Sequence, residues 1–363
     1  MKLLLRFPGG VRCEIVSARG ALSRAGRWIR GLVPGASRAA VLSDAHTRPY
    51  ARRLELSLRR AGISAASCRL PAGESHKTGA TLSRLWEAFA ERGLDRHSCV
   101  VIVGGGVLGD LGGFAAATYM RGIAAVQVPT TLLAQVDAAI GGKTAVNLRA
   151  GKNLAGTFTQ PRGVLIDPDT LRTLAPRDYA TGLAEVIKYG VIRDAALFEI
   201  LERSASKLAA RDPALLGSIV NRCVRIKGEV VRRDERESKL RMILNYGHTV
   251  GHALERASNY RLTHGEAVAV GMAAEARIAR RLGIAGDAFV ERQDALIRRL
   301  GLPLRAKLPA SAHPRLAAAL KLDKKARAGK LRFVLPSGPG LVRYPVAVDA
   351  KIIFEILPET LSH

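Results

Sequence analysis

The chain has 363 residues, 48% of them hydrophobic and 24% charged, and its formal net charge at pH 7 is +26. These values exclude a disordered acidic chain, a collagen-like chain and a small disulfide-stapled protein, and the length predicts about two domains. No apolar run reaches the ~18 residues that a membrane span needs, and the apolar start is too short for a signal peptide. Four dispersed cysteines without a CxxC pair predict reduced thiols in a cytosolic protein.

The positive charge is unevenly distributed along the chain. Its excess lies in residues 1–100 and 201–363, whereas residues 101–200 are nearly neutral. Such a field attracts nucleic acid or anionic substrates. Aromatic residues make up only 5% of the chain, which is unlike a stacking platform for single strands. We therefore favour a solvated basic surface and keep nucleic-acid binding as an alternative that rests on charge alone.

The first 160 residues alternate short apolar runs with helical periods. Strands are predicted at 39–42, 98–103 and 124–128, and helices at 81–92 and 110–120. The run at 98–103 is apolar throughout, as expected of a parallel strand that is buried on both faces. The alternation predicts an α/β domain with a parallel, Rossmann-like sheet.

After Pro176 the pattern becomes mainly helical. A mixed segment with short apolar runs at 331–335 and 351–357 follows the last helical period. We therefore predict an α/β domain over 1–175 and a mainly α-helical C-terminal domain over 176–363. The helical periods are 183–191, 195–210, 215–233, 249–258, 267–282 and 289–300.

A glycine-rich turn, Gly104–Asp110, follows the apolar strand, opens a helix and fits the pattern G-x-G-x-x-G. In that context backbone N–H groups can hold a pyrophosphate, although a tight turn without a ligand has the same pattern. A Rossmann site takes the ribose with an acidic residue about 20 positions later. Here Pro129–Thr131 stands at that place. The turn is compatible with a dinucleotide, but not with an ordinary Rossmann site.

Three of the eight histidines, His248, His252 and His264, fall within 17 residues and are flanked by glycines. His248 and His252 are four positions apart and share one face of a helix. Neutral imidazoles with a third ligand nearby favour a divalent metal site, and a catalytic zinc takes three protein ligands and leaves one position open. The spacing does not decide which two histidines bind, and it names no carboxylate.

Two further groups of residues carry chemistry. Lys143 after Gly141–Gly142, and Lys152 with Asn153, are predicted in glycine-rich loops, where they either bind phosphate or carboxylate oxygens or are simply solvated. Glu185 and Lys188 are three positions apart on an otherwise apolar helix. Charges on such a face are costly unless they are paired or functional, so these two form either a surface ion pair or part of a site.

Taken together, the motifs resemble those of the 3-dehydroquinate synthase family, in the same order from about residue 40 to 335. Small departures are Tyr246, where the family often has Leu, and Thr181, where Asn or Ser is frequent. Residues 1–38 match little. The resemblance rests on GGGVLGDLGGF from Gly104, YMRG from Tyr119, PTTLLAQVDAAIGGKT from Pro129, GKN from Gly151, GLAEVIK from Gly182, NYGHTVGH from Asn245 and HGEAV from His264.

This resemblance implies a homodimeric cytoplasmic lyase of the shikimate pathway, which leads to chorismate and the aromatic amino acids. The enzyme would convert 3-deoxy-D-arabino-heptulosonate 7-phosphate to 3-dehydroquinate and phosphate. Its cofactors would be catalytic NAD and Zn²⁺, with Co²⁺ as a substitute. An N-terminal NAD domain and a helical metal domain are implied, with a small phosphorylated sugar acid as substrate and no membrane.

Site residues are implied by the same motifs. The metal ligands would be Glu185, His248 and His264. Arg121 would reach the active site of the partner subunit. The residues implied for NAD are Asp44, Gly73, Glu74, Ser75, His76, Lys77, Gly106, Val107, Leu108, Gly109, Asp110, Thr130, Thr131, Lys143, Lys152, Thr170, Leu171, Arg172 and Thr173. Those implied for substrate and catalysis are Asp137, Lys143, Lys152, Asn153, Lys188, Lys227, Arg241, Asn245, His252 and one lysine of the pair Lys324 and Lys325, of which we choose Lys324.

The implied chemistry leaves rival activities to weigh. In the family, NAD oxidises an alcohol, the ketone acidifies the neighbouring proton, phosphate leaves with its own oxygen as base, and NADH returns the hydride. A related cyclase that makes an inosose or a valiolone would share these steps. The residues that match the dehydroquinate pattern instead are Lys227, Arg241, Asn245 and His252. A metal-dependent polyol or glycerol-phosphate dehydrogenase would release NADH, and it is disfavoured by Lys143 after two glycines and by the pair Lys324 and Lys325. An inactive descendant is disfavoured because every implied ligand is retained.

Overall fold

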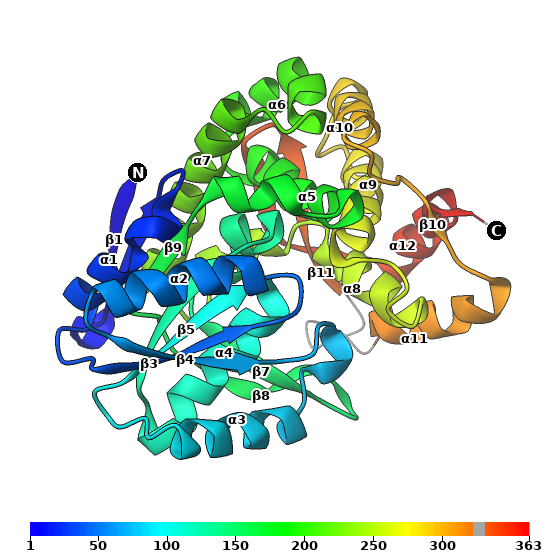
Figure 1. The fold of residues 1–363 in the computed structure, drawn as a ribbon. Coiled ribbons are helices and arrows are strands. Elements are labelled where there is room, and N and C mark those ends of the chain that lie inside the picture. Colours follow the sequence, from blue (N-terminus) through cyan, green and yellow to red (C-terminus); the bar gives the residue numbers. More distant parts are fainter. Residues whose placement is uncertain (322–330, 363) are drawn as a thin grey trace. The chain divides into compact units, whose positions relative to one another are not determined.

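The computed structural model describes residues 1–321 and 331–362 (Figure 1). The chain divides into two compact units. Unit 1 comprises Met1–Leu174 and Cys223–Arg236, and unit 2 comprises Ala175–Arg222 and Glu237–His363. Among the described residues, no helix combines the length and the apolar character that crossing a membrane requires.

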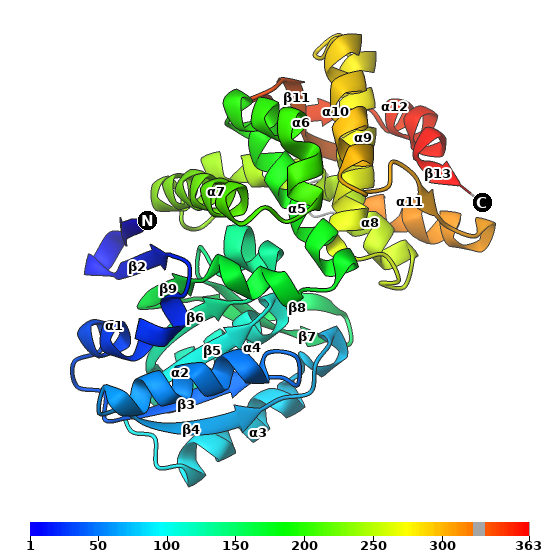
Figure 2. The same cartoon turned by 45° about the horizontal axis from the view of Figure 1, so that its top comes forward.

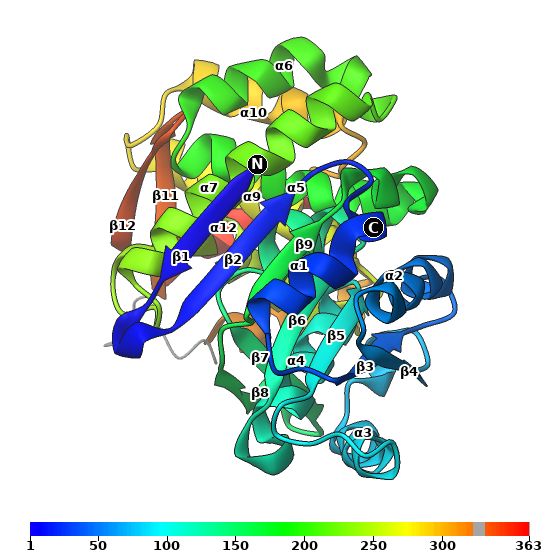
Figure 3. The same cartoon turned by 60° about the vertical axis from the view of Figure 1, so that its left-hand side comes forward.

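Unit 1 contains a seven-stranded sheet in the order β1-β2-β9-β6-β5-β3-β4, and Figure 3 shows the strands side by side. All neighbours pair in parallel except β1 and β2, which form an antiparallel hairpin at one edge. The local residue pattern of residues 1–17 did not predict that hairpin. The strands are β1 (Lys2–Arg6), β2 (Arg12–Ser17), β3 (Arg38–Ser43), β4 (Ser64–Arg69), β5 (Cys99–Gly104), β6 (Ala124–Pro129) and β9 (Gly163–Ile166).

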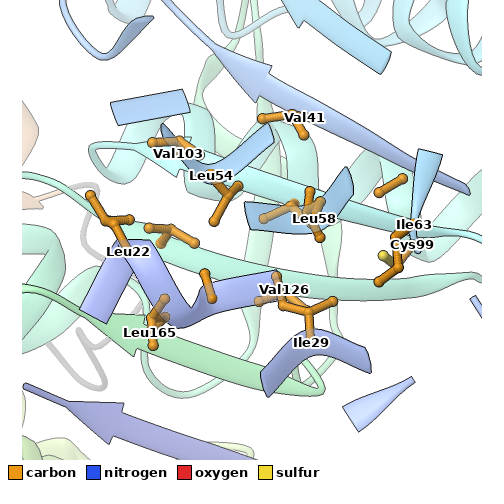
Figure 4. Packing of buried hydrophobic residues seen from close by; sticks show 14 of the residues in the cluster. Leu22, Ile29, Val41, Leu54, Leu58, Ile63, Cys99, Val103, Val126 and Leu165 are labelled. Carbon is orange, nitrogen blue, oxygen red and sulfur yellow. The ribbon is translucent and has the colours of Figure 1, made fainter. Parts of the chain in front are cut away.

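Helices cover both faces of this sheet, as the apolar β5 predicts. Cys99, Val101 and Val103 pack on α1 (Ala25–Leu32) and α2 (Arg48–Arg60), in the cluster that Figure 4 shows. The alternate residues Val100 and Ile102 pack on α3 (Gly79–Glu91) and α4 (Gly106–Thr118) on the other face. The period of two along one strand therefore fills two separate cores.

The strand order places a switch point between β3 and β5, because the chain continues outward from β3 to β4 and then returns to β5. Ligands of open α/β sheets bind outside the carboxyl ends of the strands at such a point. The glycine-rich turn after β5 lies there and leads directly into α4, which begins at Gly106 rather than at the predicted residue 110. A Cβ on Gly112 would lie 2.8 Å from side-chain atoms of Leu42 and Ile102, so the glycines let α4 approach the sheet closely.

A second hairpin in unit 1 corrects one expectation. Lys143 is the first residue of β7 (Lys143–Leu148), and Lys152 and Asn153 lie in β8 (Gly151–Phe158), which pairs antiparallel with β7. These residues were expected in loops because glycines surround them. Cross-strand pairing between β7 and β8 outweighs that local signal.

Unit 2 is mainly helical (Figure 2). The central helix α9 contacts α5, α8, α10 and α12. The run at 331–335 is part of strand β11, and the run at 351–357 is helical. The elements are α5 (Pro176–Ile192), α6 (Ala195–Ala209), α7 (Pro213–Arg233, whose last part belongs to unit 1), α8 (His248–Ala257), α9 (His264–Arg281), α10 (Asp287–Arg299), α11 (His313–Lys321), α12 (Ala350–Ile356), β10 (Ala306–Lys307), β11 (Leu331–Gly338), β12 (Leu341–Val348) and β13 (Leu361–Ser362).

Candidate functional site

Three side chains of unit 2 converge as a candidate metal group, which we define as Glu185, His248 and His264. One ligand atom from each lies within 4.8 Å of the others. The Nε2 atoms of His248 and His264 both lie 3.5 Å from the same oxygen, Oε1 of the fully buried Glu185. Two imidazoles and one carboxylate are a typical donor set for catalytic zinc. The metal group therefore fits a divalent metal.

His248 and His264 are the first residues of α8 and α9, so the starts of these two helices position the imidazoles. His264 opens α9, where Thr263 and Glu266 form a reciprocal capping box. The Thr181 hydroxyl on α5 donates to the Thr263 hydroxyl at 2.8 Å. A Cβ on Gly265 would lie 2.3 Å from the Thr181 carbonyl oxygen, so this glycine permits the close approach of α5 and α9. Thr181, a departure from the family pattern, thus helps to join the helices of Glu185 and His264.

Hydrogen bonding and electrostatics prepare the two imidazoles differently. Nδ1 of His248 donates to the Tyr246 carbonyl at 3.0 Å, which leaves Nε2 unprotonated toward Glu185. Burial, and then the Lys188 charge, hold the pKa of His248 well below its usual value. Burial opposes the charge of His264 as well, but Glu185 and Glu255 outweigh it and raise the pKa of His264 to about 10. Glu255 lies 3.6 Å from His264 Nδ1, the side away from Glu185.

Other implied substrate residues lie in the same unit. Lys188 is buried against Glu185 and forms an ion pair with it. The exposed His252 belongs to a second candidate group with Glu255 and His264, and its ring centroid is 5.1 Å from that of His248. Arg241 is buried on the turn η7 (Leu240–Asn245). At the end of that turn, the Asn245 amide donates to Glu237 at 2.7 Å.

Unit 1 brings together a second set, the lysine cluster, which we define as Lys77, Asp110 and Asn153. The buried Lys77 ammonium donates to the Asp110 carboxylate and to the Asn153 amide oxygen, the latter at 2.5 Å. Burial raises the pKa of Asp110, and the Lys77 charge partly offsets that effect. Asn153 has a positive φ of 57°, a conformation that asparagine tolerates better than most residues.

Asn147 on β7 organises the lysine cluster, although sequence reasoning missed it. Its amide donates to Glu74 at 2.8 Å, and its oxygen accepts from the Asn153 backbone N–H at 3.0 Å. Its own backbone N–H donates to the Lys77 carbonyl at 2.8 Å. Nothing in its local sequence distinguishes it. Lys152 lies 4.0 Å from Glu74, so the implied residues of the segment from 73 to 77 and those of β8 meet here.

The remaining implied NAD residues follow the carboxyl ends of the strands. The Thr130 N–H donates to the Gly104 carbonyl at 3.0 Å. Asp44 after β3 accepts from the Thr47 N–H at 2.8 Å. Gln135 donates to the Thr170 hydroxyl at 3.0 Å. Thr170, Leu171, Arg172 and Thr173 lie on the turn η6 (Pro168–Thr173), Gly73, Ser75 and His76 at or on η3 (Glu74–His76), and Val107, Leu108 and Gly109 on α4; Thr131 follows β6.

Three further implied residues, Lys227, Lys143 and Arg121, are outside the metal group and the lysine cluster. Lys227, from the part of α7 in unit 1, pairs with Asp137 at 2.7 Å. Lys143 is exposed. Arg121 has a φ of 66° and lines a cavity of about 850 Å³ with Arg96 and His97, beside the amino ends of β5 and β6 and so at the opposite edge from the glycine-rich turn. Lys324 and Lys325 lie outside the described residues.

Both halves of the chain match models of one family. Residues 67–181 match the model described as 3-dehydroquinate synthase N-terminal, and residues 182–326 match the one described as 3-dehydroquinate synthase C-terminal. The 3-dehydroquinate synthases of a Synechococcus strain and of Nostoc punctiforme are each 49% identical to this chain, and each alignment covers 95% of both chains.

Solved structures of related cyclases share the fold. A 2-deoxy-scyllo-inosose synthase, complexed with carbaglucose-6-phosphate, NAD⁺ and Co²⁺, has a TM-score of 0.88 and 30% identity over 99% of this chain and 100% of its own. A 2-epi-5-epi-valiolone synthase from Streptomyces hygroscopicus, with NAD⁺ and Zn²⁺ bound, has a TM-score of 0.87 and 32% identity over 96% and 97%. A probable glycerol dehydrogenase from Sinorhizobium meliloti, at 16% identity and a TM-score of 0.64, shares the fold alone.

Proposed function

Because this chain belongs to the 3-dehydroquinate synthase family, we propose that it converts 3-deoxy-D-arabino-heptulosonate 7-phosphate to 3-dehydroquinate and phosphate. The observation that carries the proposal is the convergence of Glu185, His248 and His264 on one point of unit 2. Identity over nearly the whole length is higher to the dehydroquinate synthases than to the two related cyclases, at 49% against 30% and 32%.

The metal group and the residues at the carboxyl ends of the sheet are the proposed cofactor sites. Glu185, His248 and His264 would hold Zn²⁺ or Co²⁺, and the glycine-rich turn with Thr130, Thr131 and the lysine cluster would hold NAD. When bound, the metal supplies Lewis-acid polarisation of the carbinol and ketone oxygens, and the nicotinamide supplies a reversible hydride acceptor.

The side chains of this protein have separate tasks in the proposal. Lys188, buried beside Glu185, stabilises the ionised carboxylate, and its ammonium group would contact the substrate. His248 presents an unprotonated Nε2 because its Nδ1 proton is committed to the Tyr246 carbonyl. The phosphate and carboxylate oxygens of the substrate would be bound by Arg241, Asn245, Lys143, Lys152 and one lysine of the pair Lys324 and Lys325. His252 would face the phosphate.

The proposal includes the assembly and the compartment. We propose a homodimer in which Arg121 serves the partner's active site, because its cavity lies apart from the glycine-rich turn and the lysine cluster of its own unit. Cys13, Cys68 and Cys99 are buried free thiols, which fits the cytoplasm.

Nucleic-acid binding is supported only by the net charge of +26. Binding that falls steeply with salt and ignores sequence would favour it.

The decisive experiment follows phosphate release from the heptulosonate phosphate at a catalytic amount of NAD, with and without a metal chelator. Absorbance at 340 nm is recorded in parallel. We expect release that the chelator abolishes and that zinc restores, without net NADH. NADH in stoichiometric amounts from a polyol phosphate would identify a dehydrogenase instead. Formation of an inosose or a valiolone from another sugar phosphate, without turnover of the heptulosonate, would identify one of the other cyclases.

A further inference from the structure

Glu275 is a buried carboxylate on α9 that is outside the metal group. Glu275 is fully buried, and the residues beside it, Ala273, Ala274 and Ala276, are buried and apolar. One oxygen, Oε2, accepts from the backbone N–H of Gly247 at 2.7 Å, and the other, Oε1, accepts from the N–H of Val250 at 3.4 Å. Glu275 thus binds the backbone on both sides of His248. A buried charge in an apolar run is destabilising unless something specific stabilises it.

The start of α8 depends on this contact. The first N–H groups of a helix have no intrahelical acceptor and are usually satisfied by a cap side chain. The N-cap of α8 is Gly247, with a φ of 78°, and no side chain of the N-cap accepts there. Glu275 supplies the acceptor oxygens from a different helix, and the carboxyl group is a favourable partner for a helix N-terminus.

Close backbone contact fixes where the two helices meet. A Cβ on Gly271 would lie 1.9 Å from the Gly247 carbonyl oxygen, and one on Gly251 would lie 3.1 Å from the Ala267 oxygen. Glycines at these positions allow α8 and α9 to touch, so that the Glu275 carboxylate can reach the first turn of α8. Residue 275 is one helical turn beyond Gly271 on the same face of α9.

The contact between α8 and α9 determines the position of His248. It is the first residue of α8, between the two N–H groups that Glu275 binds. On the preceding side, Tyr246 is anchored by its hydroxyl, which donates to Gln293 at 2.7 Å, and its carbonyl accepts from His248 Nδ1 at 3.0 Å. The backbone is therefore held on both sides of the imidazole, and the direction of Nε2 follows from it.

We propose that Glu275 is a positioning residue of the metal site: by binding the N–H groups of Gly247 and Val250 it holds His248 where its Nε2 meets Glu185 and His264. The inference rests on the proposed metal site and deepens it. Groups that orient a metal ligand without touching the metal typically change metal affinity by about 10- to 100-fold. A carboxylate that only stabilises the fold would leave the affinity of the folded protein unchanged.

The test compares Glu275→Ala and Glu275→Gln with the unaltered full-length chain. Zinc affinity of the metal-free proteins is measured by competition with a chromophoric chelator. We expect about tenfold or more weakening for Glu275→Ala and a smaller loss for Glu275→Gln, whose amide oxygen can still accept from Gly247. In Co²⁺-loaded protein, the visible absorption bands of Glu275→Ala should shift, because the direction of the His248 ligand changes.

Asp194→Ala is the matched control. Asp194 also accepts a helix N-terminal N–H in unit 2, that of Leu197 at 3.0 Å, but on α6, which carries none of the metal group. We expect Asp194→Ala to lower the melting temperature and to leave zinc affinity unchanged.

Zinc affinity of Glu275→Ala within twofold of the unaltered chain would overturn the inference. If that variant does not fold, unchanged affinity and an unchanged cobalt spectrum in Glu275→Gln would overturn it. His248→Ala separates this failure from failure of the metal site itself. If His248→Ala binds zinc as tightly as the unaltered chain, the proposed metal group is wrong and the inference falls with it.

Discussion

The metal group and the lysine cluster satisfy their charges in different ways. In the lysine cluster the cation is part of the protein, because the Lys77 ammonium lies between Asp110 and Asn153. In the metal group the Nε2 atoms of two imidazoles each lie 3.5 Å from one oxygen of Glu185. Lys188 pairs with the other oxygen of Glu185, whereas the first oxygen faces the two imidazoles, and a donor set of this kind favours an added metal ion. We expect the first site to be stable without a ligand and the second to gain stability when a metal binds. The two sites should therefore respond differently to substitution and to metal removal.

The largest expected effect is on the metal group. Glu185→Ala removes the oxygen that faces both imidazoles, and we expect zinc binding to be lost and kcat to fall about a thousandfold, equivalent to roughly 4 kcal/mol of transition-state stabilisation. Steady-state kinetics and metal analysis of the purified variant measure both quantities. NAD affinity should be unchanged, since the proposed NAD residues lie in unit 1. Full activity after chelation and dialysis would contradict the prediction.

A smaller effect is expected at the lysine cluster. Asp110→Asn leaves the buried Lys77 ammonium with neutral acceptors, and we expect the free energy of unfolding to fall by about 2 kcal/mol. Denaturant unfolding measures this loss. We also expect about tenfold weaker NAD binding by fluorescence titration, since 1.4 kcal/mol of the lost interaction corresponds to that factor. Zinc affinity should stay the same. A fall in zinc affinity equal to that in NAD affinity would show that the two sites do not act separately.

A third prediction tests the backbone contact near the metal group. Gly271→Ala places a methyl group 1.9 Å from the Gly247 carbonyl oxygen, and we expect a loss of about 1–3 kcal/mol as α8 and α9 move apart. Zinc affinity should fall as well, because His248 moves with α8. The control is Gly217→Ala on α7, where a Cβ would meet nothing within 4 Å and helix propensity predicts a gain of up to about 1 kcal/mol. Equal stability of the two variants would contradict this account.

Local pattern was enough to predict several elements and to miss others. The apolar run at 98–103 predicts β5, and the helical periods predict the long helices of unit 2. The hairpin of β7 and β8 was missed because its glycines and lysines resemble those of a loop. The inclusion of Cys223–Arg236 in unit 1 has no local signal either, since α7 is one uninterrupted helix in the sequence.

The residues of the candidate site also divide into those that local pattern predicts and those that it does not. The spacing of the histidines predicts a metal site, and it places His248 and His252 on one face of a helix. In the structure His248 instead lies with Glu185 and His264, and His252 belongs to a second candidate group. Glu185 became a candidate ligand through family resemblance, because no spacing relates it to residues 63 and 79 positions away. Asn147 and Glu275 escaped notice because their partners are distant in the sequence and they belong to no motif.

Local patterns of residues were enough to predict the helices and strands with a fixed period, the glycines that permit close approach, and the family. The folded structure was needed to show which donors share a point in space, which backbone N–H groups the Glu275 carboxylate satisfies, and which unit contains Lys227. These two kinds of information differ in range along the chain. Helix and strand periods act over a few residues, whereas a metal group or a buried cap requires atoms that the folding of the whole unit brings together.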